Sequence, residues 1–318
     1  MSEELIVARG LTKKFGDFTA VDGIDFSVYR GESFGLLGPN GAGKSTTMRI
    51  IGATSQRTSG DLTILDKDPE KFGPQIRAHL GVIPQKDNLD EQLTVTENLY
   101  IYGRYFGLSN KFIKGKIEEL LEFAQLEEKR DAKVESLSGG MKRRLTIARA
   151  LVSEPDILML DEPTTGLDPR GRQDMWGVIE ELVKGGVTLL LTTQYLEEAD
   201  QLADEIAVID TGKVIARGTS DALKKQVGGE RLEVVVEAQH IQKTMEIVSK
   251  ISGINPSLDE GLRQISAPVS TGSKALFDVL KALDESGIHA LDVGLKRPSL
   301  DDVFLSLTGH AAEITEKN

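Results

Sequence analysis

Nine consecutive residues near the N-terminus have types and a spacing suited to holding phosphate. They are Gly38, Pro39, Asn40, Gly41, Ala42, Gly43, Lys44, Ser45 and Thr46, and the first eight match the pattern G-x-x-x-x-G-K-[ST] without a mismatch. Glycines let the backbone turn so that several N–H groups face one anion, and a following helix N-terminus adds partial positive charge. Lys44 can reach the β- and γ-phosphates of a nucleotide, and the Ser45 hydroxyl can bind Mg²⁺. We therefore predict a nucleotide phosphate site; a glycine-rich turn that binds nothing is the alternative.

Two carboxylates follow a short apolar run further along the chain. Asp161 and Glu162 come directly after Ile157–Leu160, which is typical of a buried strand. Beside a phosphate loop, Asp161 can supply a second contact to Mg²⁺, directly or through water. Glu162 can polarise an attacking water molecule. The alternative is a pair of solvated acids at the end of a strand.

A second glycine-containing turn opens a predicted helix. Ser138 can cap this helix, and the free N–H groups of its first turn, beginning at Gly139 and Gly140, form another anion site. This second site lacks a lysine and metal ligands of its own, so we expect it to close over a nucleotide bound to another chain. Two chains related by a two-fold axis would then bury two nucleotides. An ordinary helix cap is the alternative.

The elements that position these residues follow from the apolar pattern. Short apolar strands alternate with amphipathic helices, which predicts a parallel sheet. The predicted strands of this sheet are Ser33–Leu37, Gly81–Ile83, Ile157–Leu160, Thr188–Thr192 and Ile206–Ile209. A small antiparallel β layer is predicted before them, from Leu5–Val7 and Val21–Val28, and a largely helical insert at about residues 88–152.

A change in composition near Gly228 and Gly229 predicts a domain boundary. We expect one domain at residues 1–228, a small α+β domain with an antiparallel sheet at 229–310, and a flexible tail at 311–318. The strands predicted for the second domain are Leu232–Val236, Gly261–Ser266 and Ala290–Leu295. Its predicted helices are Met245–Ile251, Ala275–Leu283 and Leu300–Leu307, the last capped by Ser299.

Charge and composition narrow the function. The 318 residues include 38 Lys and Arg against 50 Asp and Glu, and the resulting net charge of -12 argues against a nucleic-acid partner. The absence of Cys excludes a disulfide framework and a thiolate metal site. No apolar run approaches the ~18 residues of a membrane helix, and the acidic N-terminus does not resemble a signal peptide. We expect a chain that stays inside the cell and reaches a membrane only through a partner.

In combination and order, these motifs resemble the ATP-binding subunit of the ABC transporter family, from about Leu5 to Gln226. The phosphate loop matches the Walker A motif, the strand ending at Asp161 matches Walker B, and Leu137–Gly140 matches the family signature. The resemblance implies a P-loop NTPase (ABC ATPase) fold of the α/β class, with an antiparallel β subdomain and a helical subdomain. It also implies ATP and Mg²⁺ as cofactors, and a signature motif that completes the active site of the opposite subunit.

The resemblance implies roles for three further residues. Gln85 matches the Q-loop, which contacts Mg²⁺ and senses the membrane partner. Asp168, in Gly166-Leu167-Asp168, matches the D-loop, which crosses the dimer interface next to the nucleotide. Phe15 lies where the family stacks an aromatic ring on adenine, a contact that any π-face can make. A core aromatic is the alternative for Phe15.

Two residues depart from the family pattern. Met141 replaces the usual Gln after the signature glycines, and Gln194 replaces the usual His of the switch position. Gln194 can donate a hydrogen bond to a γ-phosphate but cannot gain a proton near neutral pH. The predicted catalytic residues are therefore Glu162 as base, Gln194 in positioning and Lys44, and the predicted Mg²⁺ ligands are Ser45, Gln85 and Asp161.

Two segments resemble the daunorubicin/doxorubicin-resistance export ATPases, namely Thr192–Asp200 and Arg297–Phe304. The resemblance implies an ATP-hydrolysing subunit that powers a membrane exporter of hydrophobic compounds. Its partners would be a second ATP-binding subunit, in a homodimer, and a separate integral membrane permease at the cytoplasmic face of the cell membrane. The alternatives are a soluble ABC-type ATPase that acts on a ribosome or other non-membrane partner, and a nucleotide-sensing module that hydrolyses little ATP.

Three tyrosines in the helical insert suggest where a permease would dock. Tyr100, Tyr102 and Tyr105 follow Gln85 in the chain, and we expect exposed rings that receive a cytoplasmic helix of the partner. Packing within the insert is the alternative.

Overall fold

The computed structural model describes residues 3–86, 88–226, 230–259, 261–269, 271–296 and 298–308. The chain forms two compact units, one up to Ser220 and the other beginning at Asp221. The predicted boundary after residue 228 and the predicted tail at 311–318 lie outside the described residues. No helix within the described ranges is both long enough and apolar enough to cross a lipid bilayer.

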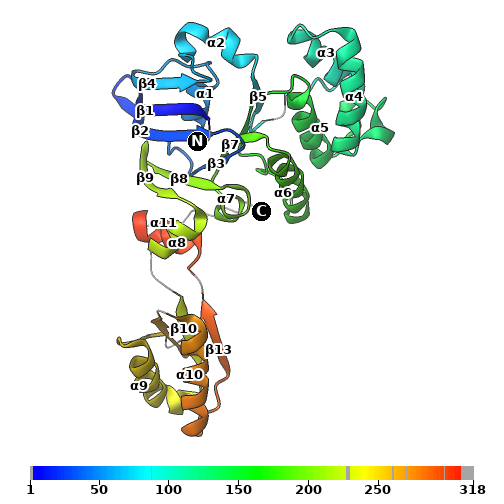
Figure 1. The fold of residues 1–318 in the computed structure, drawn as a ribbon. Helices are drawn as coiled ribbons and strands as arrows, with labels where there is room; N and C mark the ends of the chain where they lie inside the picture. The colour runs from blue at the N-terminus through cyan, green and yellow to red at the C-terminus, as the bar shows by residue number, and fades with distance from the viewer. Residues whose placement is uncertain are drawn as a thin grey trace. The chain divides into compact units, whose positions relative to one another are not determined.

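A six-stranded sheet forms the centre of the first unit (Figure 1). Its strands, in spatial order, are β5 (Leu80–Ile83), β6 (Ile157–Asp161), β7 (Thr188–Thr193), β3 (Ser33–Leu37), β8 (Glu205–Asp210) and β9 (Lys213–Gly218). The first five run parallel and β9 pairs antiparallel with β8, so the predicted parallel sheet is confirmed and β9 is an additional edge strand. Every residue of β3 and β7 is buried, as expected for parallel strands covered on both faces.

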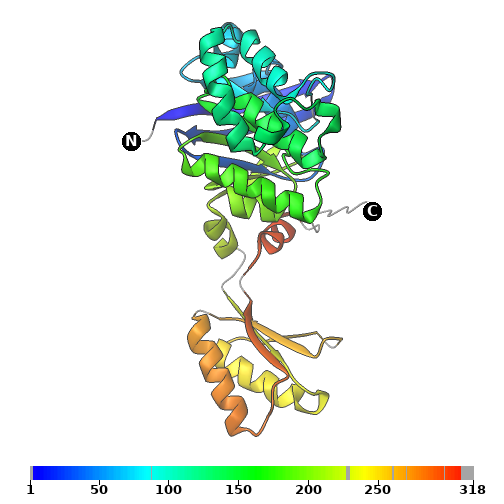
Figure 2. The ribbon, with the colours of Figure 1, turned by 90° about the vertical axis from the view of Figure 1, so that its right-hand side faces the viewer.

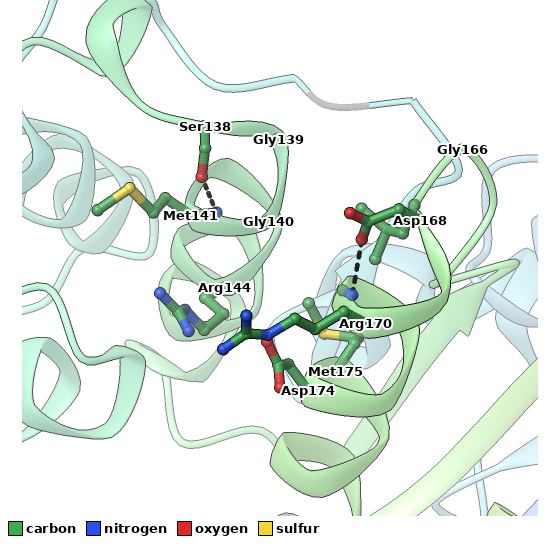
Figure 3. A pocket seen from close by; sticks show the side chains of 12 residues that line it. Ser138, Gly139, Gly140, Met141, Arg144, Gly166, Asp168, Arg170, Asp174 and Met175 are labelled. Atoms are coloured by element: carbon green, nitrogen blue, oxygen red, sulfur yellow. Dashed lines mark hydrogen bonds between the residues drawn. The ribbon is translucent and has the colours of Figure 1, made fainter.

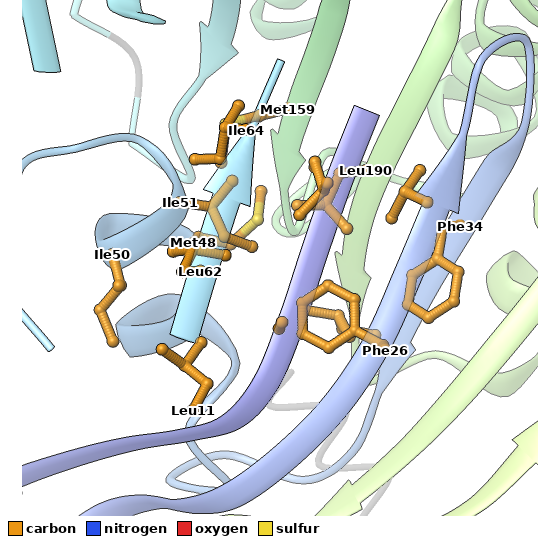
Figure 4. Packing of buried hydrophobic residues seen from close by; sticks show 14 of the residues in the cluster. Leu11, Phe26, Phe34, Met48, Ile50, Ile51, Leu62, Ile64, Met159 and Leu190 are labelled. Atoms are coloured by element: carbon orange, nitrogen blue, oxygen red, sulfur yellow. The ribbon is translucent and has the colours of Figure 1, made fainter. Parts of the chain in front are cut away.

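The predicted antiparallel layer is also confirmed and has a third strand. It contains β2 (Phe18–Tyr29), β1 (Glu4–Phe15) and β4 (Ser59–Ile64), in that order. Helix α1 (Lys44–Ile51) contributes Ile50 and Ile51 to the core that joins this layer to the central sheet (Figure 4). In the same core, the ring of Phe26 stacks on that of Phe34 with 5.4 Å between centroids. This apolar packing fixes the direction in which α1 presents its N-terminus.

The helical insert is confirmed. Its helices are α3 (Val95–Tyr105), α4 (Asn110–Ala124) and α5 (Gly139–Leu151), with short 3-10 turns at Glu127–Lys129 and Val134–Ser136. Buried side chains such as Leu99, Ile113 and Leu145 give the insert a core of its own. The remaining helices of the first unit are α2 (Pro69–Arg77), α6 (Pro169–Lys184) and α7 (Leu196–Leu202).

The second unit contains an antiparallel sheet, as predicted, but with four strands where three were expected. Its strand order is β11 (Ser257–Asp259), β12 (Gln264–Pro268), β10 (Arg231–Val235) and β13 (Asp292–Lys296). Helices α9 (Ile241–Ser252) and α10 (Gly272–Glu285) pack on it (Figure 2). The helices at its ends are α8 (Ser220–Gln226) and α11 (Leu300–Thr308), the latter capped by Ser299, whose hydroxyl accepts the Asp302 N–H.

One predicted strand of the second unit was placed wrongly. The prediction Gly261–Ser266 covers a turn and the first part of β12, which begins at Gln264 and runs to Pro268. Residues 261–263 form the turn between β11 and β12, and Arg263 adopts a positive φ of 54° that no extended strand allows.

Candidate active site

The phosphate loop bridges β3 and α1. The Gly38 N–H donates to the Thr193 carbonyl at 3.2 Å, which anchors the loop to β7. A Cβ atom added at Gly38 would lie 2.1 Å from the Ile209 oxygen, and one added at Gly43 would lie 2.3 Å from the Ala20 oxygen. Gly43 also has a φ of 104°, which L side chains rarely adopt. The fold therefore has no room for a side chain at either glycine. Without side chains, the backbone of the phosphate loop is accessible to a ligand.

The rest of the loop forms a tight turn. The Ala42 N–H donates to the Pro39 carbonyl at 3.2 Å, and Asn40 and Gly41 are exposed at the tip. Thr46 is half-buried in the first turn of α1. Exposed N–H groups at a helix N-terminus fit the binding of a phosphate anion.

The Lys44 side chain folds back over this loop. Its Nζ donates to the carbonyls of Gly38 at 2.6 Å and Pro39 at 3.0 Å and lies 3.5 Å from Glu162 Oε1. Only 4 % of the Lys44 side chain is exposed, and this burial lowers the pKa of Lys44, while the Glu162 carboxylate acts in the opposite direction. The Lys44 ammonium is buried, and its neighbours are two carbonyls and one carboxylate at 3.5 Å. It is therefore suited to bind a phosphate, which carries more negative charge.

A hydroxyl and a carboxylate converge at the ends of α1 and β6. Ser45 Oγ donates to Asp161 Oδ1 at 3.2 Å, and Thr192 Oγ1 donates to the same oxygen at 2.5 Å. Hydroxyl and carboxylate oxygens are the hard ligands that Mg²⁺ prefers, so these residues fit the implied metal. Sequence reasoning missed Thr192, because its contact depends on the pairing of Asp161 with Thr192 between β6 and β7.

Glu162 lies at the centre of this cluster with 5 % of its surface exposed. Its Oε2 accepts hydrogen bonds from Gln85 Nε2 at 2.7 Å and from Thr165 Oγ1 at 3.2 Å. Its backbone has a φ of 48°, a left-handed conformation that is uncommon outside glycine and is often found at functional sites. The alternative of solvated acids is therefore wrong for Glu162, which is buried and partnered.

Two further predicted residues lie at the margins of the site. Gln194 is half-buried and directly follows β7, at the same sheet edge as the phosphate loop. Phe15 is 52 % exposed at the end of β1, with Lys13 Nζ 4.9 Å from its ring centroid. The core alternative for Phe15 is therefore wrong, and its stacking on adenine stays a prediction.

The second glycine turn belongs to a separate hollow of about 500 Å³. Ser138 caps α5 by accepting the Met141 N–H at 3.3 Å, and Asp168 caps α6 by accepting the Gly171 N–H at 2.7 Å (Figure 3). Arg144, Arg170 and Asp174 also line this hollow, whereas among the described residues none of the phosphate loop does. The structure thus brings the predicted signature residues Ser138, Gly139 and Gly140 together with Asp168, apart from Lys44 and Glu162.

Comparison with known proteins identifies the family. Residues 21–165 match the family model described as ABC transporter. The chain is 44% identical to "Daunorubicin resistance ATP-binding protein DrrA3" of Streptomyces coeruleorubidus over 317 residues, which cover 99% of each protein. It is 47% identical to "Nod factor export ATP-binding protein I" of Cupriavidus metallidurans over 309 residues, 96% of this chain and 97% of that protein.

A solved structure with the same fold is a dimeric ATP-binding cassette in a post-hydrolysis state, bound to ADP and Pi. It is 27% identical, covers 67% of this chain and 98% of its own, and superposes with a TM-score of 0.60. The chain therefore belongs to the ABC transporter family; it is an ATPase whose cofactors are ATP and Mg²⁺.

Proposed function

We propose that this chain powers a membrane exporter of hydrophobic compounds, working as a homodimer that sandwiches nucleotide between two copies. The observation that carries the catalytic part is the position of Glu162: buried, in a strained backbone conformation, and 3.5 Å from Lys44 Nζ. The relatives named for daunorubicin resistance and Nod factor export support export over an action on a ribosome.

The chemistry assigned to the site is the transfer of the γ-phosphoryl group of ATP to water. The Lys44 ammonium and the backbone N–H groups of the first turn of α1 hold the phosphates and counter their charge. Glu162 accepts a proton from the attacking water molecule while the water oxygen bonds to the γ-phosphorus. At the same time the bond between the γ-phosphorus and the oxygen that leaves with ADP breaks. Gln194 positions the γ-phosphate by donating a hydrogen bond.

Ser45, Gln85 and Asp161 would hold Mg²⁺. When bound, the ion neutralises charge on the phosphate oxygens. The Ser45–Asp161 hydrogen bond supports this assignment, since it already orients two of the three ligands toward each other. Gln85 contacts Glu162 and so links the metal ligands to the base.

The second half of each nucleotide site is assigned to the partner copy. The hollow is lined by Ser138, Gly139, Gly140 and Asp168 at two helix N-termini, and no lysine among the described residues lines it. Helix N-termini favour anions, so this surface suits a phosphate group that arrives on another chain. The solved relative is dimeric and bound to ADP and Pi, which supports a dimer as the nucleotide-bound form.

The membrane partner is assigned to the helical insert. Tyr105 is 82% exposed on α3 and is the aromatic that we assign to docking a permease helix at the cytoplasmic face of the membrane. Tyr100 and Tyr102 are half-buried and pack on the core of the insert, so their predicted exposure was wrong. In this proposal residues 1–228 form the ATP-binding domain, with the helical subdomain at about 88–152, and residues 229–310 form the C-terminal domain.

A concentration series of phosphate release tests the proposal. The rate per chain is expected to rise with protein concentration, because each site needs two copies, and to require Mg²⁺. Reconstitution with the permease in vesicles should then stimulate release further. Full turnover by a chain held monomeric would contradict the shared site, and negligible release by the dimer would favour the nucleotide-sensing alternative.

A further inference from the structure

A fully buried carboxyl group lies next to the active-site segments and has no part in the proposed chemistry. Glu198, on α7, is 0% exposed, and its Oε1 accepts hydrogen bonds from Thr164 Oγ1 at 2.7 Å and Trp176 Nε1 at 3.2 Å. Its Oε2 has no hydrogen-bond partner among the described residues. Burying a carboxyl group costs desolvation free energy, and an apolar residue would fill the same space without that cost. The presence of Glu198 therefore calls for an explanation beyond packing.

The environment of Glu198 favours its neutral form. Burial raises the pKa of Glu198, although the polar side chains of Thr193, Thr164 and Trp176 act in the opposite direction. A neutral carboxyl can both accept and donate a hydrogen bond, and its nearest isosteric replacement is the amide of Gln.

The polar neighbours of Glu198 belong to three segments that the proposed function uses. Thr164 lies two residues after Glu162, in the segment that leads to Asp168. Thr193 directly precedes Gln194. Trp176 lies on α6, the helix that Asp168 caps.

A second contact from α6 reaches Tyr195, the residue that follows Gln194. The Arg172 guanidinium lies 4.5 Å from the ring centroid of Tyr195. Arg172 and Trp176 are four residues apart and so share a face of the helix. Thr193 and Tyr195, the two neighbours of Gln194, thus both lie against groups tied to α6.

We propose that Glu198 is a positioning residue that ties Gln194 to Asp168 through α6, so that contact by a second copy at Asp168 sets the switch side chain. The inference rests on the proposed function, in which Asp168 faces the partner and Gln194 faces the γ-phosphate. A helix transmits displacement along its length because its backbone hydrogen bonds are intact, and α6 runs from Pro169, next to its cap Asp168, past Arg172 and Trp176.

The test uses three variants of the full chain. Thr164→Val keeps the shape of a buried side chain and removes its hydroxyl donor to Glu198. Glu198→Gln keeps an acceptor and a donor. Thr244→Val makes the same change at a buried threonine of the second unit and serves as the control.

Steady-state kinetics separate positioning from stability. Thr164→Val is expected to lower kcat by about ten- to a hundredfold, the size of effect that misplacing a reacting group produces, with the KM for ATP nearly unchanged. Glu198→Gln should keep at least half of the wild-type kcat, and Thr244→Val all of it. If Thr164→Val lowers only Tm and leaves kcat at the wild-type value, Glu198 is structural and the proposal is wrong.

Fluorescence gives a second readout that does not depend on turnover. Trp176 is the only Trp in the chain, so its emission reports directly on the Glu198 cluster. In a Glu162→Gln background, Mg²⁺ and ATP should shift this emission, and adding Thr164→Val should abolish the shift. If the Trp176 emission does not change when Mg²⁺ and ATP are added, the inference is wrong. If the wild-type chain releases no phosphate, the proposed function is wrong instead.

Discussion

In the proposed function, the N-termini of α1 and α5 each present glycines to a phosphate group. The two regions differ in how many of the groups needed for catalysis their own chain supplies. At α1, the lysine, the hydroxyl and both carboxylates come from one chain and bond to one another, leaving Lys44 4% and Glu162 5% exposed. At α5, Gly139 is exposed and faces an open hollow. In the proposed function, the cluster at α1 is therefore the completed half of a nucleotide site, and the turn at α5 is the outward half, which a second copy would use.

The same residue type serves different physical needs in the two regions. Gly43 has a positive φ and no room for a Cβ atom, so the fold itself requires it. Gly139 has nothing within 4 Å of an added Cβ, so nothing in its own chain forbids a side chain there. A glycine that the monomer does not need points to a requirement imposed from outside the chain.

The largest expected effect comes from breaking the completed half. Glu162→Gln should lower phosphate release by at least about a hundredfold, since general base catalysis contributes about 10²–10⁴. Dimerisation induced by ATP should persist, because the Gln amide has nearly the same shape. Light scattering after gel filtration measures the dimer; retention of normal hydrolysis would remove the base role from Glu162.

Paired glycine substitutions test the difference between the two regions directly. Gly43→Ala should lower Tm, because it forces a strained φ and a backbone clash. Gly139→Ala should leave Tm unchanged or raise it slightly, yet lower phosphate release by at least about tenfold, a loss of ~1.4 kcal/mol of transition-state stabilisation. Normal ATPase activity in Gly139→Ala would show that no partner approaches this surface closely.

A smaller effect is expected from restoring the family residue in the outward half. Met141→Gln adds an amide at the hollow, and one added hydrogen bond contributes about 0.5–1.5 kcal/mol. The ATP concentration for half-maximal phosphate release should fall by about two- to tenfold. Met141→Leu is the control, since Met141 also packs on the core of the insert; equal behaviour of the two variants would show that residue 141 does not reach the nucleotide.

The smallest effect concerns an ion pair elsewhere in the first unit, between Arg57 and Asp68. Asp68 accepts hydrogen bonds from Arg57 at 2.9 and 3.0 Å, which hold the pKa of Asp68 at about 2, below its ordinary 3.8. A depressed pKa adds stability above about pH 4 that is lost as the pH falls toward 2. Asp68→Asn keeps the helix cap, so the free energy of unfolding from urea titrations should drop by an amount on the order of 1 kcal/mol at pH 7, and the difference should vanish near pH 2. A difference that does not depend on pH would show that the pair contributes nothing through charge.

Elements with unambiguous local signals were predictable. The strands and helices that flank the phosphate loop, the cap at Ser138 and the helical insert all follow from neighbours in sequence. Helix α2 was missed because Gly73 and Pro74 lie inside it and argue against a helix; its Phe72 indeed has non-helical angles. Strands β4 and β9 were missed because both are short, partly exposed edges without a clear alternation.

Exposure was less predictable than secondary structure. Tyr102 and Tyr105 lie three residues apart on α3, yet one packs on the insert and the other is 82% exposed. The pattern of a single helix does not specify which neighbours cover it, and α3 is covered by α4 and α5.

The sequence by itself determined the phosphate loop, because a glycine-rich turn between a strand and a helix is specified by covalently adjacent residues. Tertiary structure alone decided which distant side chains meet there. Gln85 reaches Glu162 across 77 residues, Thr192 reaches Asp161 through sheet register, and Glu198 reaches Thr164 through helix packing. The reason is that register and packing depend on the burial of whole faces, which no local stretch of residues contains.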